Sequence, residues 1–381
     1  MINLAKREIE HTLGKFLVTS AGVGMLLGIV LIMIGVYRGM IIDAQVLIDD
    51  IGADLWVVQE GTLGPFAEAS RVHEDLKNSI GIIEGVEKAE GITFQNMQVP
   101  TQSGLVRVMA VGYDPLGSFS AINPARLVKG RMLKEEHYEM VATDKIGLNL
   151  GEKVPLGRDI YTVVGITHGS VSSGGDPLVY VSLKDAQKLQ FLYSNARIRN
   201  DRARGIHGES SHMVNAVIAQ TKAGYDAKEV AKSIKRWKHK SVYTFEEERE
   251  VLTKNLIKMA SKQIGMFTVI LVIVSTIIIA LIIYTMTLEK IKEIAIMKLI
   301  GLPDRIIIKM IMQETLLMGV LAFIAANIFA HLIYTKFPKR VVLEVPDALT
   351  LFAVVLIASI LASLAGVKKV MAADPREAIG G

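Results

Sequence analysis

The chain has 381 residues, of which 51% are hydrophobic, and a formal net charge of +5. It contains no cysteine, which excludes disulfide bonds, thiolate zinc sites and a cysteine nucleophile. The basic charge suits contact with anionic lipid as well as with nucleic acid, but the sequence carries no nucleic-acid-binding motif, and its apolar residues lie in long blocks typical of a membrane protein.

Four apolar segments are long enough to cross a bilayer, which requires about 20 residues of helix. They predict transmembrane helices over residues 16–41, 263–287, 304–335 and 348–367. The first is too long for a signal peptide and no small-residue cleavage site follows it, so we expect it to remain as an anchor. Residues 42–262 form one large polar insertion. The expected fold is membrane α-helical, with four transmembrane helices and a large extracytoplasmic α+β domain inserted between helices 1 and 2.

Lysine and arginine residues near the ends of the spans predict the orientation, because they are enriched in cytoplasmic flanks. Eleven lie in residues 1–15, 288–309 and 368–381, whereas four lie on the opposite side. The four exceptions are Arg38, Lys336, Lys339 and Arg340. We therefore expect a cytoplasmic N-terminal segment (1–15), a cytoplasmic tail (368–381) and a short outer loop (336–347).

The insertion has mixed helical and strand periodicity. The first span is expected to continue as a helix to a stop at Gly52, and a polar helix over 245–263 leads into the second span, so that two helical stalks support the domain. The regions predicted between them are strands at 54–59, 104–113 and 159–166, a short helix at 78–86, and strand–helix units at 177–190 and 212–237.

Two stretches of the insertion are expected to be flexible loops, at 167–177 and 194–211. The second contains four arginines, Arg197, Arg199, Arg202 and Arg204. It is either a solvated loop or a surface that grips an acidic partner or lipid headgroups.

The sequence offers no catalytic motif. It lacks a phosphate-binding G-x-x-x-x-G-K-[ST] loop, an H-E-x-x-H zinc motif and a G-x-S-x-G nucleophile motif, and its eight histidines are scattered. A metal site assembled from distant histidines stays open. No catalytic, cofactor-binding or metal-binding residue is predicted, and the chain is not expected to hydrolyse ATP by itself.

The third span contains polar residues that are candidates for an intramembrane site, because ionisable side chains are costly in lipid. They are Glu314, Asn327, His331 and Tyr334. Their helical spacing allows a polar line along a cavity. The alternative is that Glu314 faces water at the interface and that His331 makes a hydrogen bond to another helix.

Small residues recur at four-residue spacing in two spans, which allows helix backbones to approach closely in lipid. Gly24 and Gly28 form such a row in the first span, and Ala358, Ala362 and Gly366 form one in the fourth. The sequence leaves open whether these rows pack within one chain or between two copies.

Residues 288–303, "LEKIKEIAIMKLIGLP", lie between the second and third spans and predict a short amphipathic helix. Its apolar face is expected to contain Ile291, Ala295, Leu299 and Leu302. Gly301 and Pro303 are expected to end it.

The chain resembles the FtsX/MacB-type permease family of ABC transporters, as a stand-alone permease subunit of the DevC-like or haem-exporter HrtB-like kind. The stretches that carry the resemblance are residues 52–61, 125–166, 288–319 and 373–379. The order of one span, a large outer domain and three further spans also matches. Only about 15 residues precede the first span, so the ATPase domain that MacB itself carries there is not in this sequence.

The resemblance implies a permease subunit of an ABC-type exporter, coupling ATP hydrolysis by a separate ATPase to motion of the extracytoplasmic domain. Residues 288–303 would be the coupling helix; the residues assigned to it are Glu289, Lys290, Lys292, Glu293, Lys298 and Gly301. ATP and Mg would be bound by the partner ATPase.

The resemblance also implies a homodimer in a bacterial or archaeal cytoplasmic membrane, in contact with lipid and with an extracytoplasmic adaptor, and no nucleic acid. The substrate stays open among haem, glycolipid, lipoprotein, peptide and drug classes. The alternatives are an FtsX-like transmembrane signalling protein that controls an extracytoplasmic enzyme, and a membrane enzyme with its site in the outer domain.

Overall fold

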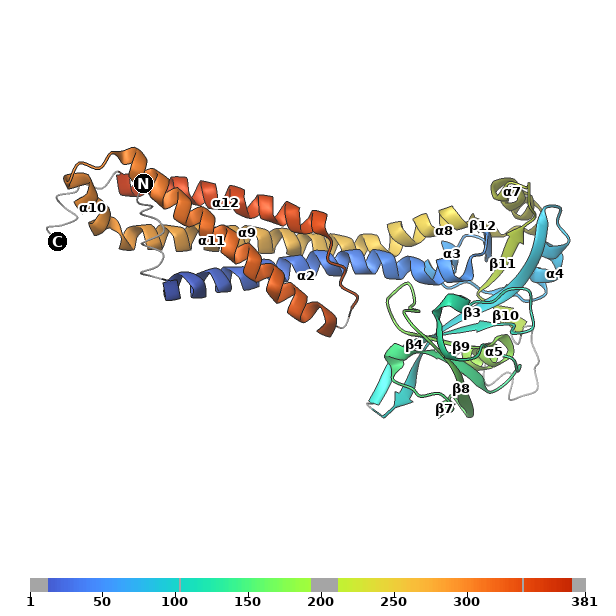
Figure 1. The fold of residues 1–381 in the computed structure, drawn as a ribbon. Helices are drawn as coiled ribbons and strands as arrows, with labels where there is room; N and C mark the ends of the chain where they lie inside the picture. Colours follow the sequence, from blue (N-terminus) through green and yellow to red (C-terminus); the bar gives the residue numbers. More distant parts are fainter. Residues whose placement is uncertain (1–12, 103, 193–211, 338, 372–381) are drawn as a thin grey trace. The chain divides into compact units, whose positions relative to one another are not determined.

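The structure is a computed structural model that describes residues 13–102, 104–192, 212–337 and 339–371 (Figure 1). The arginine-rich stretch 194–211 therefore lies outside the described residues, as do the first 12 residues and the segment 373–379. The chain divides into two compact units. We call residues 1–39 and 260–381 the helical unit, and Met40–Met259 the inserted domain.

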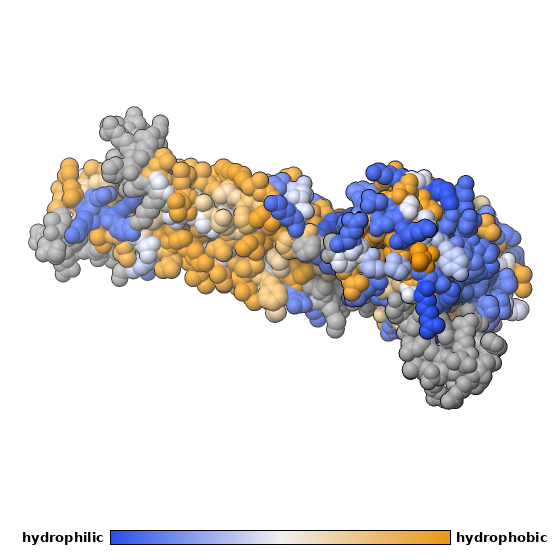
Figure 2. All heavy atoms as spheres, turned by 90° about the horizontal axis from the view of Figure 1, so that it is seen from below, coloured by the Kyte–Doolittle hydropathy of each residue, from blue (hydrophilic) through white to orange (hydrophobic). Residues whose placement is uncertain are grey.

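The helical unit is built from long apolar helices. They are the first part of α2 (Leu13–Ile51), α9 (Lys258–Glu289), α11 (Asp304–Ile333) and α12 (Val345–Met371), with the short α10 (Ile291–Leu299) and the 3₁₀ turn η5 (Tyr334–Lys336). Within the described residues, four helices are long and apolar enough to cross a membrane. Figure 2 shows an almost continuous apolar surface over these helices, with hydrophilic residues at the ends of the unit. The four expected spans are confirmed, and the chain is a multi-pass membrane protein.

Glycines end two of these helices. Gly52 has a φ of +62°, and its N–H donates to the Ile48 carbonyl at 2.9 Å, so α2 stops where the sequence predicts. Gly301 has a φ of +90° and its N–H donates to the Lys298 carbonyl at 3.0 Å. Because glycine adopts this left-handed conformation without strain, the chain can turn sharply after α10. Pro303 then precedes α11 directly.

The inserted domain contains a ten-stranded mixed sheet in the order β12-β1-β11-β3-β4-β9-β6-β8-β5, with β7 paired to β8, and a separate pair β10-β2. The strands are β1 (Leu55–Val58), β2 (Val72–His73), β3 (Val86–Thr101), β4 (Gly104–Tyr113), β5 (Leu127–Gly130), β6 (Glu139–Thr143), β7 (Lys153–Leu156), β8 (Asp159–Thr167), β9 (Leu178–Ser182), β10 (Met213–Val214), β11 (Ala216–Thr221) and β12 (Ser241–Thr244). The helices are α3 (Gly64–Ala67), α4 (Leu76–Gly81), α5 (Leu183–Leu192), α7 (Ala227–Lys238) and α8 (Phe245–Val251), the 3₁₀ turns η1 (Pro124–Arg126) and η2 (Asp144–Ile146), and the π-helical turn η4 (Leu252–Ile257). The domain is α+β, as expected.

The sequence patterns located most of these elements but missed the longest strand. The strands expected at 54–59, 104–113 and 159–166 are β1, β4 and β8, and the short helix begins two residues earlier than expected. The 16-residue β3, which pairs with both β4 and β11, was not predicted. Its charged residues near the start and Pro100 near the end hide the alternation that marks a strand.

The ends of the expected helical stalks are packed into the core of the inserted domain. Leu47, Ile48 and Ile51 at the end of α2 are buried in the same apolar cluster as Trp56 of β1 and Leu252 of η4. Burial of this apolar surface stabilises the domain, so these helix ends are part of its fold rather than free supports.

The serine-rich stretch 167–177 is a packed turn and not the flexible loop that its composition predicted. Ser170 and Ser172 are buried. The Ser172 hydroxyl accepts hydrogen bonds from the backbone N–H groups of Gly174 at 3.3 Å and Asp176 at 3.1 Å. Serine here satisfies the backbone of a tight turn, a role that composition alone does not reveal.

Candidate functional site

The short helix α10 is docked against the neighbouring ends of α11 and α12. Ile294 and Ala295 are buried, and Ile294 lies in one apolar cluster with Ile307 and Ile311 of α11 and Val367 of α12. Helix α10 is therefore packed onto two other helices of the unit by apolar contact.

The residues predicted for the apolar face of α10 differ in exposure. Ala295 is buried and Leu299 is 63% exposed, whereas Ile294, which was not assigned to that face, is buried. Residue spacing along the sequence does not show which side of α10 contacts α11 and α12. A helix that is apolar around much of its circumference offers more than one such stripe.

Lys290 lies between α9 and α10 and points inward, where it forms an ion pair with Glu314 of α11. The Lys290 Nζ and Glu314 Oε1 atoms are 2.5 Å apart, and the two side chains are 13% and 9% exposed. Glu314, an expected intramembrane candidate, thus has a partner within the chain. Lys290 does not belong to the exposed polar face to which the coupling role assigned it.

The remaining charges of α10 divide by exposure. Lys292 and Glu293 are exposed, as is Glu289 at the end of α9, whereas Lys298 is half-buried. Glu289 and Lys298 each take part in further electrostatic contacts. The exposed residues of α10 therefore include the charged Lys292 and Glu293, beside the apolar Ile296 and Leu299.

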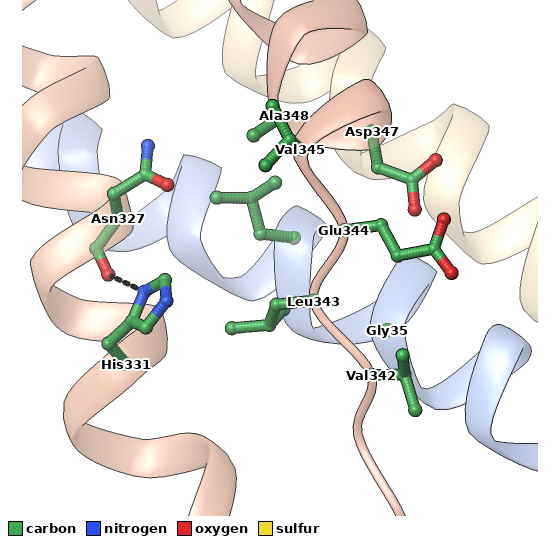
Figure 3. Close-up of a pocket in the computed structure, with 10 residues that line it drawn as sticks. Gly35, Asn327, His331, Val342, Leu343, Glu344, Val345, Asp347 and Ala348 are labelled. Atoms are coloured by element: carbon green, nitrogen blue, oxygen red, sulfur yellow. Dashed lines mark hydrogen bonds between the residues drawn. The ribbon is translucent and has the colours of Figure 1, made fainter.

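A second polar group lies at the other end of α11. Asn327 and His331 line a cavity of about 110 Å³, together with Leu31 and Gly35 of α2, the start of α12 and the segment 342–344 that precedes it. Figure 3 shows both side chains directed from α11 towards that segment. The His331 Nδ1 lies 2.9 Å from the Asn327 carbonyl oxygen. In the neutral ring Nδ1 then donates, and Nε2 is left as a hydrogen-bond acceptor.

Arg38 of α2 forms ion pairs with two acids beside this cavity. Its Nη2 donates to Asp347 Oδ1 at 2.8 Å, its Nε also bonds Asp347, and its Nη1 lies 2.9 Å from Glu344 Oε2. In Figure 3 both carboxylates point away from Asn327 and His331. Sequence reasoning had counted Arg38 only as an exception to the charge bias. The two carboxylates compensate the charge of Arg38.

The four polar candidates of the third span do not form one line. Glu314 and Asn327 are 13 positions apart in α11, which corresponds to about 20 Å at 1.5 Å per residue. Tyr334 lies in η5, with its ring centroid 6.0 Å from that of His331. The structure therefore separates a Lys290–Glu314 pair from an Asn327–His331–Tyr334 group.

The glycine row of α2 packs within the chain. A Cβ atom on Gly24 would lie 2.6 Å from the Ala325 Cβ, and one on Gly28 would lie 2.6 Å from the Phe329 Cδ1, both on α11. Gly39 continues the row, since a Cβ there would lie 1.9 Å from the Arg340 carbonyl oxygen. These glycines allow α2 to contact other segments of the same chain, which answers the question that the sequence left open for Gly24 and Gly28.

Small residues of α12 are buried, and one of them, Ser359, contacts α11. Ala358 and Ala362 are buried, and a Cβ on Gly319 of α11 would lie 2.7 Å from the Ser359 Oγ. Gly366 falls within α12. The expected packing role therefore agrees with the positions of Ala358 and Ala362.

In the inserted domain, the described residues contain no group of three or more histidine, aspartate or glutamate side chains arranged to hold a metal ion. An open groove of about 840 Å³ in this domain is lined by Arg126, Lys129 and His168, among other residues. Arg126 forms an ion pair with Asp50 at 2.6 Å, and the His168 Nδ1 lies 2.5 Å from Asp144 Oδ2.

Glu248 of α8 is an unusual acid of the inserted domain. Its side chain is fully buried, and among the described residues neither carboxylate oxygen has a hydrogen-bond partner. Burial raises the pKa of the Glu248 carboxyl to about 8. By contrast, a hydrogen bond from Arg131 holds the pKa of Glu139 at about 2. Gly64 has a φ of +75° and lies against Glu248, because a Cβ there would be 2.4 Å from its Oε2.

Comparison with known proteins identifies both parts of the chain. Residues 16–237 match the MacB-like periplasmic core domain, and residues 265–375 match the FtsX-like permease C-terminal region. An uncharacterized ABC transporter permease of Mycobacterium tuberculosis is 24% identical over 383 residues, covering all of both chains. A putative hemin transport system permease protein, HrtB, of Staphylococcus haemolyticus is 22% identical over 385 residues, covering all of this chain and 99% of the relative.

Two solved structures align with about half of the chain. The extracellular domain of the noncanonic ABC-type transporter YknZ from Gram-positive bacteria covers 50% of this chain and 98% of its own, with a TM-score of 0.32 and 14% identity. The periplasmic region of MacB from Actinobacillus actinomycetemcomitans covers 53% of this chain and 94% of its own, with a TM-score of 0.36 and 8% identity. The family matches cover more than half of the chain and fall on both of its units, so the chain belongs to the FtsX/MacB-type ABC transporter permeases.

Proposed function

We propose that this chain is the permease subunit of an ABC-type exporter or extruder, and that a separate ATPase docks on the exposed polar face of α10. The observation that carries this proposal is the two-sided character of α10. Ile294 attaches it to α11 and α12, whereas Lys292 and Glu293 stay exposed for a partner. A short helix with one face packed on other helices and one charged face exposed suits transmission of a partner's movement.

The ATPase would bind ATP and Mg and perform the hydrolysis. Movement would then reach the inserted domain, which is expected to act on the substrate outside the membrane. Helix α2 supports this route, because it runs without interruption from Leu13 to Ile51 and its last turns belong to the core of the inserted domain. We place both termini in the cytoplasm, in line with the lysine and arginine bias, and expect two copies of this chain in the complex.

The substrate class rests on weaker support. One relative is named as a putative hemin transport permease, which makes haem one candidate beside glycolipid, lipoprotein, peptide and drug. Identification of small molecules that co-purify with the complex from its native membrane would distinguish these classes.

The docking surface is tested by reversing one exposed charge, Lys292→Glu. Co-purification of the ATPase and permease-stimulated ATP hydrolysis should both fall, because an unfavourable charge at an interface rim slows association. Lys336→Glu is the matched control, since Lys336 is an exposed lysine in η5, at the opposite end of α11 from α10. Wild-type recovery and stimulation with Lys292→Glu, and also with Glu293→Lys, would place the ATPase elsewhere on the chain.

A further inference from the structure

The Lys290–Glu314 ion pair joins the turn before α10 to the side of α11. Lys290 separates the last residue of α9, Glu289, from the first residue of α10, Ile291. Glu314 lies ten positions into α11, which is about 15 Å along that helix. The pair therefore fixes the point about which α10 would have to turn relative to α9.

Burial makes this contact difficult to exchange for water. The two side chains are 13% and 9% exposed. The cavity beside them is lined by Ile283, Met286 and Met318 among others and has a volume of about 20 Å³, which is room for about one water molecule. Separating the pair would leave two buried charges with little solvent, and such separation is strongly unfavourable.

A second contact holds α10 farther along its length. Ile294 is packed against Ile307 and Ile311 of α11 and Val367 of α12. An ion pair before the first turn and an apolar contact farther along would prevent α10 from tilting alone. A displacement of α10 would then move α11 and α12 as well, instead of only bending the turn between α9 and α10.

We propose that the buried Lys290–Glu314 ion pair is the positioning contact that couples α10 to α11, so that movement imposed on α10 by the ATPase is transmitted into the helical unit. This proposal rests on the proposed function and deepens it. It gives Lys290 a role distinct from ATPase binding. Loss of the pair uncouples hydrolysis from the permease while the ATPase stays bound through the exposed face of α10.

The test compares Lys290→Glu, Glu314→Lys and the double exchange in the full complex. Each single variant places two like charges in one buried site, and the exchange restores opposite charges. The neutral variants Lys290→Gln and Glu314→Gln avoid the like-charge contact, so they serve where a reversal prevents folding. Lys309→Glu, a charge reversal on the same part of α11, controls for a general charge effect.

Two quantities are measured: the ATPase recovered per permease, and the permease-dependent stimulation of hydrolysis per bound ATPase. Single variants should keep recovery near the wild-type value and lose stimulation by about 5- to 150-fold, the usual range of coupling between sites. The double exchange should restore most of it. Stimulation that persists per bound ATPase in the single or neutral variants would overturn the proposal, and so would failure of a correctly inserted exchange variant to recover. Loss of recovery with normal stimulation per bound ATPase would also overturn it, and would mean that Lys290 serves binding. A loss of ATPase docking would instead appear as lower ATPase recovery, which is the result expected for Lys292→Glu.

Discussion

Replacing Glu248 with glutamine should remove most of the loss of stability that the inserted domain suffers as pH rises. The folded domain holds the Glu248 carboxyl at a pKa of about 8, compared with 4.5 for an ordinary glutamate, because burial penalises the charged form. Below pH 4.5 the carboxyl is protonated in both the folded and the unfolded chain and costs nothing. Between pH 4.5 and about 8, the folded state must keep a proton that the unfolded state has lost, so stability falls as pH rises.

The size of the effect follows from the folded and unfolded pKa values. When these two pKa values differ by one, the free energy of unfolding changes by about 1.36 kcal/mol, so Glu248 costs the folded state on the order of 3 kcal/mol at pH 7. The cost levels off at about 5 kcal/mol above pH 8. Glutamine avoids this ionisation, although its amide would itself be buried without partners at a cost of about 1–3 kcal/mol. The difference between the pH profiles of wild type and variant is therefore a better measure than stability at one pH.

Tryptophan fluorescence during thermal unfolding of the full chain in detergent measures this difference. The chain has two tryptophans, and both lie in the inserted domain. Trp56 is buried, with its ring centroid 5.4 Å from that of Phe66 in α3, a helix that also contacts α8. Trp237 is exposed and should change little. Trp56 therefore reports on the region around Glu248.

From pH 5 to pH 8, the Glu248 penalty should grow by about 3.5 kcal/mol, so the wild-type Tm should fall relative to the Glu248→Gln variant by roughly 7–14 °C, at 2–4 °C per kcal/mol for a domain of this size. The pKa of Tyr243 is also raised, by burial and by Glu248, so this tyrosine titrates above the window. Parallel Tm profiles for wild type and variant between pH 5 and 9 would refute the reasoning and mean that Glu248 is ionised or solvated in the folded domain.

Three further predictions concern the membrane part and its orientation. A cysteine at the exposed Ser233 should react with an impermeant thiol reagent in intact cells, or in spheroplasts where an outer membrane blocks access. A cysteine at the exposed Lys292 should not react. The reverse pattern would show that the topology is inverted. Gly39→Ala should lower the free energy of unfolding by about 1–3 kcal/mol through overpacking, because its Cβ would lie 1.9 Å from a backbone oxygen. Gly22→Ala, where a Cβ would have nothing within 4 Å, should be neutral or stabilising. Equal effects of the two substitutions in a thermal scan would argue against the close approach at Gly39. Arg38→Met should destabilise the helical unit because it removes the partner of two carboxylates. Arg38→Lys should restore only part of the loss, since lysine cannot form the bidentate bond. A fully stable methionine variant in a thermal scan would show that the ion pairs contribute little.

Local patterns were sufficient for much of the fold. Runs of apolar residues identified the four spans, and the position of Gly52 predicted the end of α2. The same patterns failed where an element's partners decide its form. The first residues of β3 include Glu87, Lys88 and Glu90, which lie on both faces of the strand and are exposed or half-buried, so its sequence has no clean alternation. The serines at 170 and 172 look like loop residues, yet both are buried in a packed turn.

The candidate sites show the same division more sharply. The sequence identified Gly24 and Gly28 as packing residues, but only the structure shows that their neighbours Ala325 and Phe329 lie about 300 positions away in the same chain. Nothing in the segment around Glu248 indicates that both of its carboxylate oxygens are buried without partners. These properties depend on which segments meet in space, and composition contains no information about that.

For this protein, the sequence by itself determined the number of spans, the large insertion between the first two, the amphipathic segment after the second, and the family. Hydrophobic length, helix-ending glycines and residue spacing are properties of neighbouring residues, and they survive in a one-dimensional pattern. Only the tertiary structure decided that Lys290 faces inward to Glu314, that Arg38 holds two acids, and that the ends of α2 and η4 belong to the core of the inserted domain. Burial and ion pairing are set by packing between segments that are distant in the chain, because a charge or an apolar side chain is stable only in the surroundings that the other elements supply.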